Sequence, residues 1–238
     1  MQNACEHYGG MEKWRTVRCI RLQPDRLTGL VPWLQGLGRT FAFSGAFEIA
    51  PLKRLVKFRL FPNEGHHGVF ENGSVRIERA SDSAIVACSA DHRRTFERFG
   101  FRRWAPLDAL YFFGYALSHY HALPFTLLDA RLRSLSQSRD RSGVVYILDV
   151  EFPRDVPTHG PRQRFYIDET GRILRHDYHA EIIGFWARGA HFWKRETFCN
   201  GFPISLERQV FARVASMATP LTALHATFTE AEVELARA

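Results

Sequence analysis

The stretch RQRFYIDETGRILRHDYHAEII, residues 162–183, indicates two β-strands joined by a tight turn. β-Branched and aromatic residues alternate with polar ones on both sides of the DETG segment at 168–171. Successive side chains of a strand point to opposite faces, so this alternation is typical of strands with one buried face. The DETG segment supplies the polar residues and the glycine that hairpin turns prefer. The stretch therefore predicts an antiparallel β-hairpin.

Five further stretches carry a strand signal, either alternation or enrichment in β-branched and aromatic residues. They are residues 40–50, 54–61, 68–78, 143–152 and 204–214. Within 68–78, the sequence Glu71-Asn72-Gly73-Ser74 predicts a second hairpin turn, because Asn-Gly readily adopts the positive φ of a tight turn. Strands with such short connections are expected to follow one another as a long antiparallel meander.

The most apolar part of the chain, PLDALYFFGYALSHYHALPF at residues 106–125, predicts a buried helix. Pro106 suits the first turn of a helix, and Pro124 ends it. Apolar positions recur between them at helical spacing, at Leu107, Leu110, Tyr111, Gly114 and Leu117. The uninterrupted apolar run from 109 to 117 is too short to cross a bilayer, so we expect no stable membrane insertion.

Two weaker signals complete the outline of the fold. A short amphipathic helix is expected near the N-terminus, with Ala4, His7, Met11 and Trp14 on one side and two glycines weakening its middle. Residues 134–143, SLSQSRDRSG, predict a mobile loop. Together the elements predict an α+β fold in one domain of residues 1–238, in which a long antiparallel meander forms a curved open half-barrel around a central helix.

The chain is basic, with a formal net charge of +7, and only four of its positive residues are lysines. The densest arginine run comprises Arg93, Arg94, Arg98, Arg102 and Arg103. Acidic residues are interspersed and no nucleic-acid-binding motif accompanies the run, so a solvated basic surface is favoured over nucleic-acid binding. A partner-binding module built on residues 93–103 stays open as a further function class. The oligomeric state is not indicated by the sequence.

Four cysteines, at positions 5, 19, 88 and 199, are spread along the chain without a CxxC pair. This distribution indicates free thiols in a reducing compartment rather than a disulfide framework or a zinc site. The first residues, MQNACEHYGGMEKW, lack the apolar run of a secretory signal. We therefore expect a cytoplasmic protein.

The second strand of the hairpin has two chemically different faces. Strand alternation places Asp177 with charged neighbours on one face, and His176 and Tyr178 among apolar residues on the other. The first face fits a water-facing row of alternating charge, from which Asp177 could still reach a histidine around the strand edge. The second face resembles a cavity lining with a few convergent polar groups. We expect the side chains of His176 and Tyr178 to point into such a cavity.

Other segments could bring further residues to this hairpin. Hairpin pairing places Gln163 or Phe165 opposite residues 174–176, within side-chain reach of His176. The candidates for acid–base chemistry are His176, Tyr178, His159, His191 and Asp177, because histidine titrates near neutral pH and tyrosine can donate to an oxyanion. The candidates for ligand binding are Gln163, Trp186, Phe192, Trp193, Tyr111 and Tyr115. For any single one of these histidines, a core residue with one satisfied hydrogen bond is the commoner role.

The sequence offers no motif for a cofactor, a metal or a nucleophile. His176 and His179 diverge on a strand and His119 and His121 diverge on a helix, so neither pair predicts a metal clamp. There is no GxSxG elbow, and no glycine-rich loop connects a strand to a helix. We therefore expect no cofactor and no metal.

The order of elements resembles the LolA/LolB-like half-barrels, the superfamily of lipoprotein-localisation factors. The resemblance is carried by the hairpin FYIDETGRILRHDY and the late strand GFPISLERQVFARV, together with the helices between the strands. Within that superfamily, the chain is similar over most of residues 4–214 to a bacterial family without an assigned activity. The resemblance implies a concave apolar cavity on one side of a curved sheet, of lipid size in the carriers.

Two functions from different classes follow. The first is a cofactor-independent enzyme of isomerase, cyclase or lyase type that acts on a hydrophobic or amphipathic small molecule by histidine and tyrosine acid–base chemistry. The alternative is a non-catalytic binder or carrier of a lipid-like ligand, in which the same residues only orient a polar head. We favour the enzyme, because a carrier of apolar ligands has little use for several titratable groups in its lining.

Overall fold

The computed structural model of the chain describes residues 1–37, 43–97, 103–140 and 143–236. In this part of the chain, thirteen strands form one antiparallel sheet with the order β6-β5-β4-β3-β2-β1-β13-β12-β11-β10-β9-β8-β7. The strands are β1 Val17–Thr28, β2 Phe47–Ala50, β3 Leu55–Phe58, β4 His66–Glu71, β5 Ser74–Arg79, β6 Ile85–Ser89, β7 Arg131–Asp140, β8 Gly143–Glu151, β9 Arg162–Asp168, β10 Ile173–His179, β11 Arg188–Cys199, β12 Phe202–Val214 and β13 Met217–Leu235.

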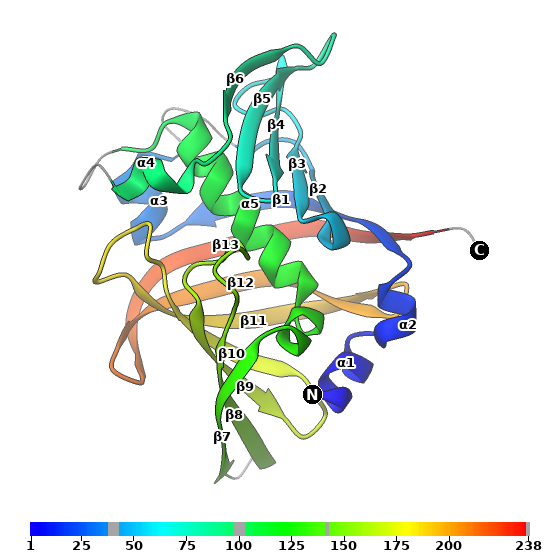
Figure 1. Cartoon of the computed structure of the whole chain (residues 1–238), viewed down its shortest axis with the longest axis vertical. Helices are drawn as coiled ribbons and strands as arrows, with labels where there is room; N and C mark the ends of the chain where they lie inside the picture. The colour runs from blue at the N-terminus through cyan, green and yellow to red at the C-terminus, as the bar shows by residue number, and fades with distance from the viewer. Residues whose placement is uncertain (38–42, 98–102, 141–142, 237–238) are drawn as a thin grey trace.

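The sheet consists of two meanders that meet at their ends. Strands β1 to β6 follow one another on one side, and β7 to β13 follow one another on the other. The first and last strands, β1 and β13, join the two meanders by antiparallel pairing from Val17 opposite Leu235 to Thr28 opposite His225. The edges β6 and β7 stay apart, so the sheet is a curved, open half-barrel (Figure 1). The predicted α+β half-barrel is confirmed.

Helices fill the hollow and cover its ends. They are α1 Gln2–His7, α2 Met11–Trp14, α3 Leu30–Gln35, α4 Arg93–Glu97 and α5 Pro106–Ala122, with short 3₁₀ turns η1 Pro51–Lys53 and η2 Phe125–Leu128. The long helix α5 links the two meanders and crosses the curved sheet (Figure 1). Every residue from Asp108 to Ala122 is buried, as expected for a helix that is apolar on nearly all sides. The predicted buried helix is confirmed.

Both predicted hairpin turns are present. Asn72 and Gly73 have φ of 45° and 96°, and Glu71 pairs with Ser74 across the turn between β4 and β5. In the turn between β9 and β10, the Asp168 carboxylate accepts hydrogen bonds from the backbone N–H groups of Thr170 and Arg172. These local bonds set the turn and thereby the pairing of the hairpin that follows.

Three local predictions are corrected by the structure. Residues 134–143 are not a mobile loop: most of them belong to β7, an exposed edge strand bonded only to β8, and residues 141–142 lie outside the described residues. The N-terminal helix is divided at Gly9 and Gly10 into α1 and α2. The strand expected at 40–50 contracts to β2, while residues 40–42 lie outside the described part.

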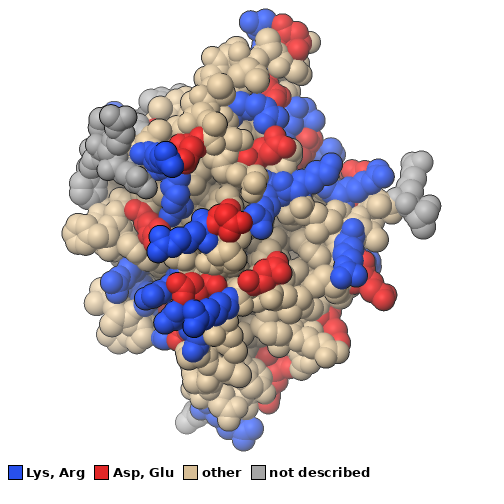
Figure 2. All heavy atoms as spheres, in the orientation of Figure 1, with Lys and Arg blue, Asp and Glu red and all other residues tan. Residues whose placement is uncertain are grey.

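Charges of both signs are mixed on the surface. In Figure 2, lysine and arginine alternate with aspartate and glutamate over the visible face rather than forming one positive patch. Many of these charges pair across neighbouring strands, for example Arg164 with Asp149 at 2.6 Å and Arg59 with Glu48 at 2.9 Å. Among the described helices, none is long and apolar enough to cross a membrane.

Candidate functional site

A cavity of about 230 Å³ lies between α5 and the middle of the sheet. Its walls come from α5, from β1 and β2, and from the later strands β10 to β13. Most of its lining is apolar, and the aromatic part consists of Phe43, Phe47, Phe112, Phe113 and Phe228. The cavity lies on the side of the curved sheet that α5 covers, where the resemblance to half-barrels implies a concave apolar cavity.

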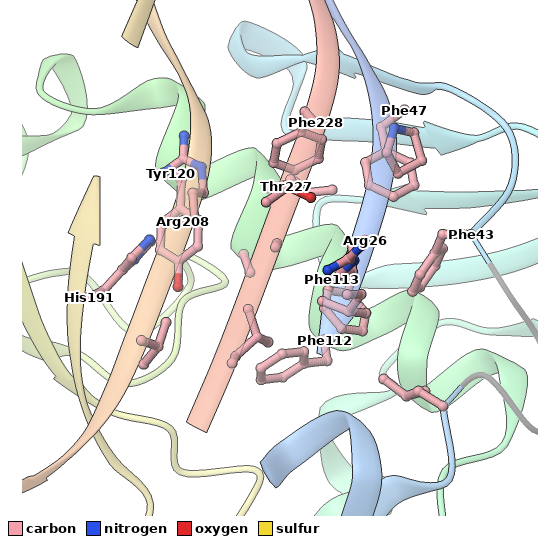
Figure 3. Close-up of a pocket in the computed structure, with 18 of the residues that line it drawn as sticks. Arg26, Phe43, Phe47, Phe112, Phe113, Tyr120, His191, Arg208, Thr227 and Phe228 are labelled. Carbon is pink, nitrogen blue, oxygen red and sulfur yellow. The ribbon is translucent and has the colours of Figure 1, made fainter. Parts of the chain in front are cut away.

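The buried polar groups of the cavity gather at one end. Tyr120 from α5, Tyr178 from β10, His191 from β11 and Arg208 from β12 all contribute to the lining. Figure 3 shows Tyr120, His191 and Arg208 together on one side, whereas Phe43 and Phe47 lie on the other. The cavity thus has a polar end and an aromatic end, which suits an amphipathic guest.

A chain of hydrogen bonds leads from the core to this polar end. The Tyr115 hydroxyl lies 2.9 Å from His159 Nδ1, and the Tyr120 hydroxyl bonds to His159 Nε2. Tyr120 in turn donates to the Tyr178 hydroxyl at 3.2 Å. One set of roles satisfies all three bonds: Tyr115 donates to His159, His159 donates to Tyr120, and Tyr120 donates to Tyr178. This assignment leaves the Tyr178 O–H to donate into the cavity.

His176 lies one layer behind the cavity wall rather than in it. Its ring is fully buried and stacks on Phe165, with ring centroids 4.3 Å apart, and its Nε2 lies 2.7 Å from Gln163 Oε1. His119 Nε2 lies 3.0 Å from the same amide oxygen, and Gln163 donates to the Gly160 carbonyl. Gln163 therefore accepts hydrogen bonds from two imidazoles, and the predicted contact between residue 163 and His176 is confirmed.

Burial suppresses the titration of the whole cluster. It lowers the pKa of His119 to about 4 and holds the pKa values of His159, His176 and His191 well below 6.5. The same loss of water raises the pKa of the Tyr178 hydroxyl above its usual value. The charged form of each ring is disfavoured because few water dipoles reach it. The imidazoles are therefore neutral, and the phenol is protonated, at neutral pH.

Asp177 lies on the opposite side of the strand from the cavity. Its carboxylate is 2% exposed and accepts two hydrogen bonds from Arg175, at 2.6 and 2.8 Å. Arg213 from β12 approaches it to 3.6 Å. The charged face predicted for this strand is thus present, but Arg175 and Arg213 cover the aspartate instead of water.

The six residues considered for ligand binding are dispersed. Gln163 and Tyr115 belong to the buried hydrogen-bond network behind the cavity. Trp193 packs on Arg208 from the side away from the main cavity, and Tyr111 faces a separate surface pocket beside Arg93. Trp186 is 37% exposed in the turn before β11. Phe192 lies beneath Arg175 and against Phe211.

Arg208 and Tyr120 are the main cavity residues that sequence reasoning missed. Arg208 occupies an inward position of β12, in register with the buried residues Ile204 and Val210. An arginine at an apolar position of an alternating strand is the signal that could have identified it. Tyr120 is one of several aromatic residues in α5, and only the packing of the helix selects the one that reaches the cavity.

The histidines do not form a metal site in the described part of the chain. No group of three or more histidine, cysteine, aspartate or glutamate side chains has the arrangement to hold an ion there. The imidazoles instead bond to tyrosine hydroxyls, to an amide and to a backbone carbonyl.

Comparisons with known proteins found similarity to solved structures. No family model and no curated protein matches the sequence. Among solved structures, a LolA superfamily protein from Nitrosomonas europaea aligns over 100% of this chain and 92% of its own, with 8% identity and a TM-score of 0.48. A DUF1329 family protein from Desulfovibrio piger aligns over 99% and 92%, with 10% identity and a TM-score of 0.47. A domain described as an outer membrane lipoprotein-sorting protein, from Vibrio parahaemolyticus, aligns over 92% and 85%, with 10% identity and a TM-score of 0.43.

The hypothesis of a cofactor-independent isomerase, cyclase or lyase is wrong. The structure gives the physical reason, because a general acid or base works best with a pKa near the working pH. Burial moves the histidines below that range and Tyr178 above it. These pKa shifts favour the alternative of a binder, in which the same residues only orient a polar head.

Proposed function

We propose that the protein binds a hydrophobic or amphipathic, lipid-like small molecule in the cavity beneath α5, without changing it chemically. The observation that carries this proposal is the cavity itself, since interiors are normally packed without voids larger than a water molecule. Five phenylalanines supply apolar surface, and the buried polar groups Tyr120, Tyr178, His191 and Arg208 lie at one end. Asp25, Arg26 and Thr227, which are exposed or half-buried, line the cavity elsewhere. Apolar lining with a few placed polar groups is the usual character of small-molecule sites.

We propose in addition that the protein works in the cytoplasm. Cys5, Cys19, Cys88 and Cys199 are all free thiols, as expected for a protein that works in a reducing cytoplasm. Burial raises the pKa of the Cys5, Cys19 and Cys199 thiols, which keeps them protonated and unreactive.

Binding is tested with a neutral apolar dye, N-phenyl-1-naphthylamine, whose fluorescence rises when it leaves water. The purified protein should bind the dye, and dodecan-1-ol should displace it. Ala226→Phe places a ring in the cavity from β13 and should weaken dye binding at least about tenfold, because the added side chain occupies the space of the guest.

Ala218→Phe is the matched control. Ala218 lies on the same strand but is exposed and contributes nothing to the lining. Dye binding should therefore be unchanged in this variant. Equal binding by the wild type and Ala226→Phe would show that the dye sits elsewhere, and absence of any dye or alcohol binding would contradict the proposed function.

A further inference from the structure

Arg208 is a buried cation that has no counter-ion among the residues that the structure describes. Its side chain lies on β12 and the residue is 4% exposed. Within the described residues, its Nε and Nη1 atoms have no hydrogen-bond partner. Glu196, on the neighbouring strand β11, is engaged by Arg172 at 3.0 Å instead. Buried charges in proteins are normally paired, so an arginine in this position needs an explanation.

The contacts that Arg208 does make leave most of its donors free. Its Nη2 donates to His121 Nε2 at 3.3 Å, and the His121 Nδ1–H donates to the Leu117 carbonyl, which fixes Nε2 as the acceptor. The guanidinium carbon lies 4.7 Å from the ring centroid of Trp193 and 5.3 Å from that of Tyr120. Aromatic faces stabilise a cation but accept no strong hydrogen bond in its plane. Two of the three guanidinium nitrogens are left for a guest.

Arg208 remains charged in this environment. Burial lowers its pKa to about 10, which still leaves the guanidinium protonated at neutral pH. Because the neighbouring imidazole of His191 is neutral, it neither repels nor balances this charge strongly. A positive charge is therefore held at neutral pH at the polar end of a mostly apolar cavity.

The other polar groups at this end also offer hydrogen-bond donors. The Tyr178 hydroxyl already accepts from Tyr120, which leaves its own proton for the cavity. Both ring nitrogens of His191 are buried without a partner, and a neutral imidazole carries one N–H. The guanidinium, the phenol and the imidazole N–H come from three different strands, β12, β10 and β11, and converge on one space. Convergent donors around a fixed positive charge match an oxyanion.

We propose that the ligand is an amphiphile with an anionic oxyanion head, a carboxylate or a phosphate, which binds to Arg208 while its apolar tail lies among the phenylalanines. This inference rests on the proposed function and names the class of its ligand. The Arg208 guanidinium and the Tyr178 hydroxyl hold the head, and the aromatic end around Phe47 and Phe113 holds the tail.

The test compares probes that share a tail and differ in the head. Dodecanoate, dodecyl phosphate and dodecan-1-ol are each titrated against the protein with bound N-phenyl-1-naphthylamine. At least one of the two anions should bind about tenfold or more tightly than the alcohol, and the tighter anion identifies the head. For dodecanoate the preference should vanish as the pH falls through the pKa of its own carboxyl group, roughly 4 to 5.

The decisive variant is Arg208→Met, which keeps an unbranched side chain but removes the guanidinium and its charge. It should abolish the preference for the anion over dodecan-1-ol, because neither head then meets a positive charge. Its fold is checked by the thermal unfolding midpoint, and Arg208→Lys, which keeps the charge but loses the planar fork, serves if Arg208→Met does not fold. Lys194→Met removes the same charge from an exposed position on the adjacent strand and should leave the preference intact.

The possible outcomes distinguish a failure of this inference from a failure of the proposed function on which it rests. If the alcohol binds as tightly as both anions, or if Arg208→Met keeps the preference, the oxyanion inference is overturned while the lipid-binding function stands. If Arg26→Met removes the preference and Arg208→Met does not, the head lies near exposed Arg26, and the inference is again overturned. If no probe binds, the proposed function itself fails.

Discussion

The carboxylate of Asp108 illustrates how a single buried side chain anchors the long helix. It is 1% exposed and accepts a hydrogen bond from the backbone N–H of Ala105 at 2.8 Å, at the start of α5. Its other oxygen lies 2.9 Å from His92 Nε2. The first N–H groups of a helix have no partner within the helix, so a carboxylate in the first turn both satisfies a donor and complements the helix dipole.

Replacement of this carboxylate should weaken the fold. Asp108→Ala should lower the free energy of unfolding by about 1–3 kcal/mol, because it leaves buried donors without an acceptor. Asp129→Ala changes an exposed aspartate just after η2 and should stay within about 0.5 kcal/mol of the wild type. Urea denaturation of the three proteins measures the difference. Similar values for the two variants would contradict the anchoring role of Asp108.

At the scale of elements, α5 packs so closely on β4 that one position requires glycine. A β-carbon added at Gly114 would lie 2.3 Å from Cβ of Phe70, well below any permitted contact. Phe70 is itself fully buried in β4, so it cannot move aside cheaply. The close approach of helix and sheet fixes the depth at which Phe112, Phe113 and Tyr120 enter the cavity.

The same contact predicts whether Gly114→Ala raises or lowers the free energy of unfolding. Gly114→Ala should lower the free energy of unfolding by about 1–3 kcal/mol, because overpacking outweighs the gain of about 1 kcal/mol in helix propensity. Gly65→Ala is the control, since the nearest atom to its added β-carbon is 3.6 Å away. Thermal and urea unfolding measure both variants. A more stable Gly114→Ala would show that propensity, not packing, decides this position.

At the scale of the whole molecule, the buried histidines make stability depend on pH. Burial lowers the pKa values of His119 and His121 to about 4 and 3, whereas an unfolded histidine titrates near 6.5. Below pH 6.5 the unfolded chain binds protons that the folded chain excludes, so protonation favours unfolding. The stabilising effect of the neutral rings is complete above about pH 6.5 and is lost progressively as the pH falls toward 4.

The free energy of unfolding should therefore fall steeply between pH 6.5 and 4. Each such histidine contributes up to about 1.4 kcal/mol per pH unit in that window. His119→Gln removes one titrating ring and retains a side chain that can donate to Gln163, so its slope should be shallower by up to that amount. Denaturant unfolding at a series of pH values measures the slope. A slope identical to that of the wild type would contradict the low pKa of His119.

The meander and the central helix could be predicted because their causes are local. Asn72 and Gly73 specify a turn, the DETG segment specifies another, and the apolar run of α5 can be satisfied only by burial. Strands β7 and β13 could not be predicted in this way. The described side chains of β7 are exposed, so its hydrogen bonds to β8 hold it in the sheet. Strand β13 is rich in small and polar residues, and only a few of its side chains, among them Phe228 and Val233, are buried in the core.

The sequence by itself determined the class of fold, the place of the long helix and the inward face that carries Tyr178, because alternation and turn chemistry act over a few residues. The tertiary structure alone decided that His176 lies behind the cavity wall and that Asp177 is covered by arginines. It also decided that Arg208 reaches the cavity without a counter-ion from the described part of the chain. Each of these outcomes depends on which side chains from distant strands arrive at the same place. The burial of a residue and its hydrogen-bond partners are set by the packing of distant strands, whereas alternation is a property of the segment that carries the residue.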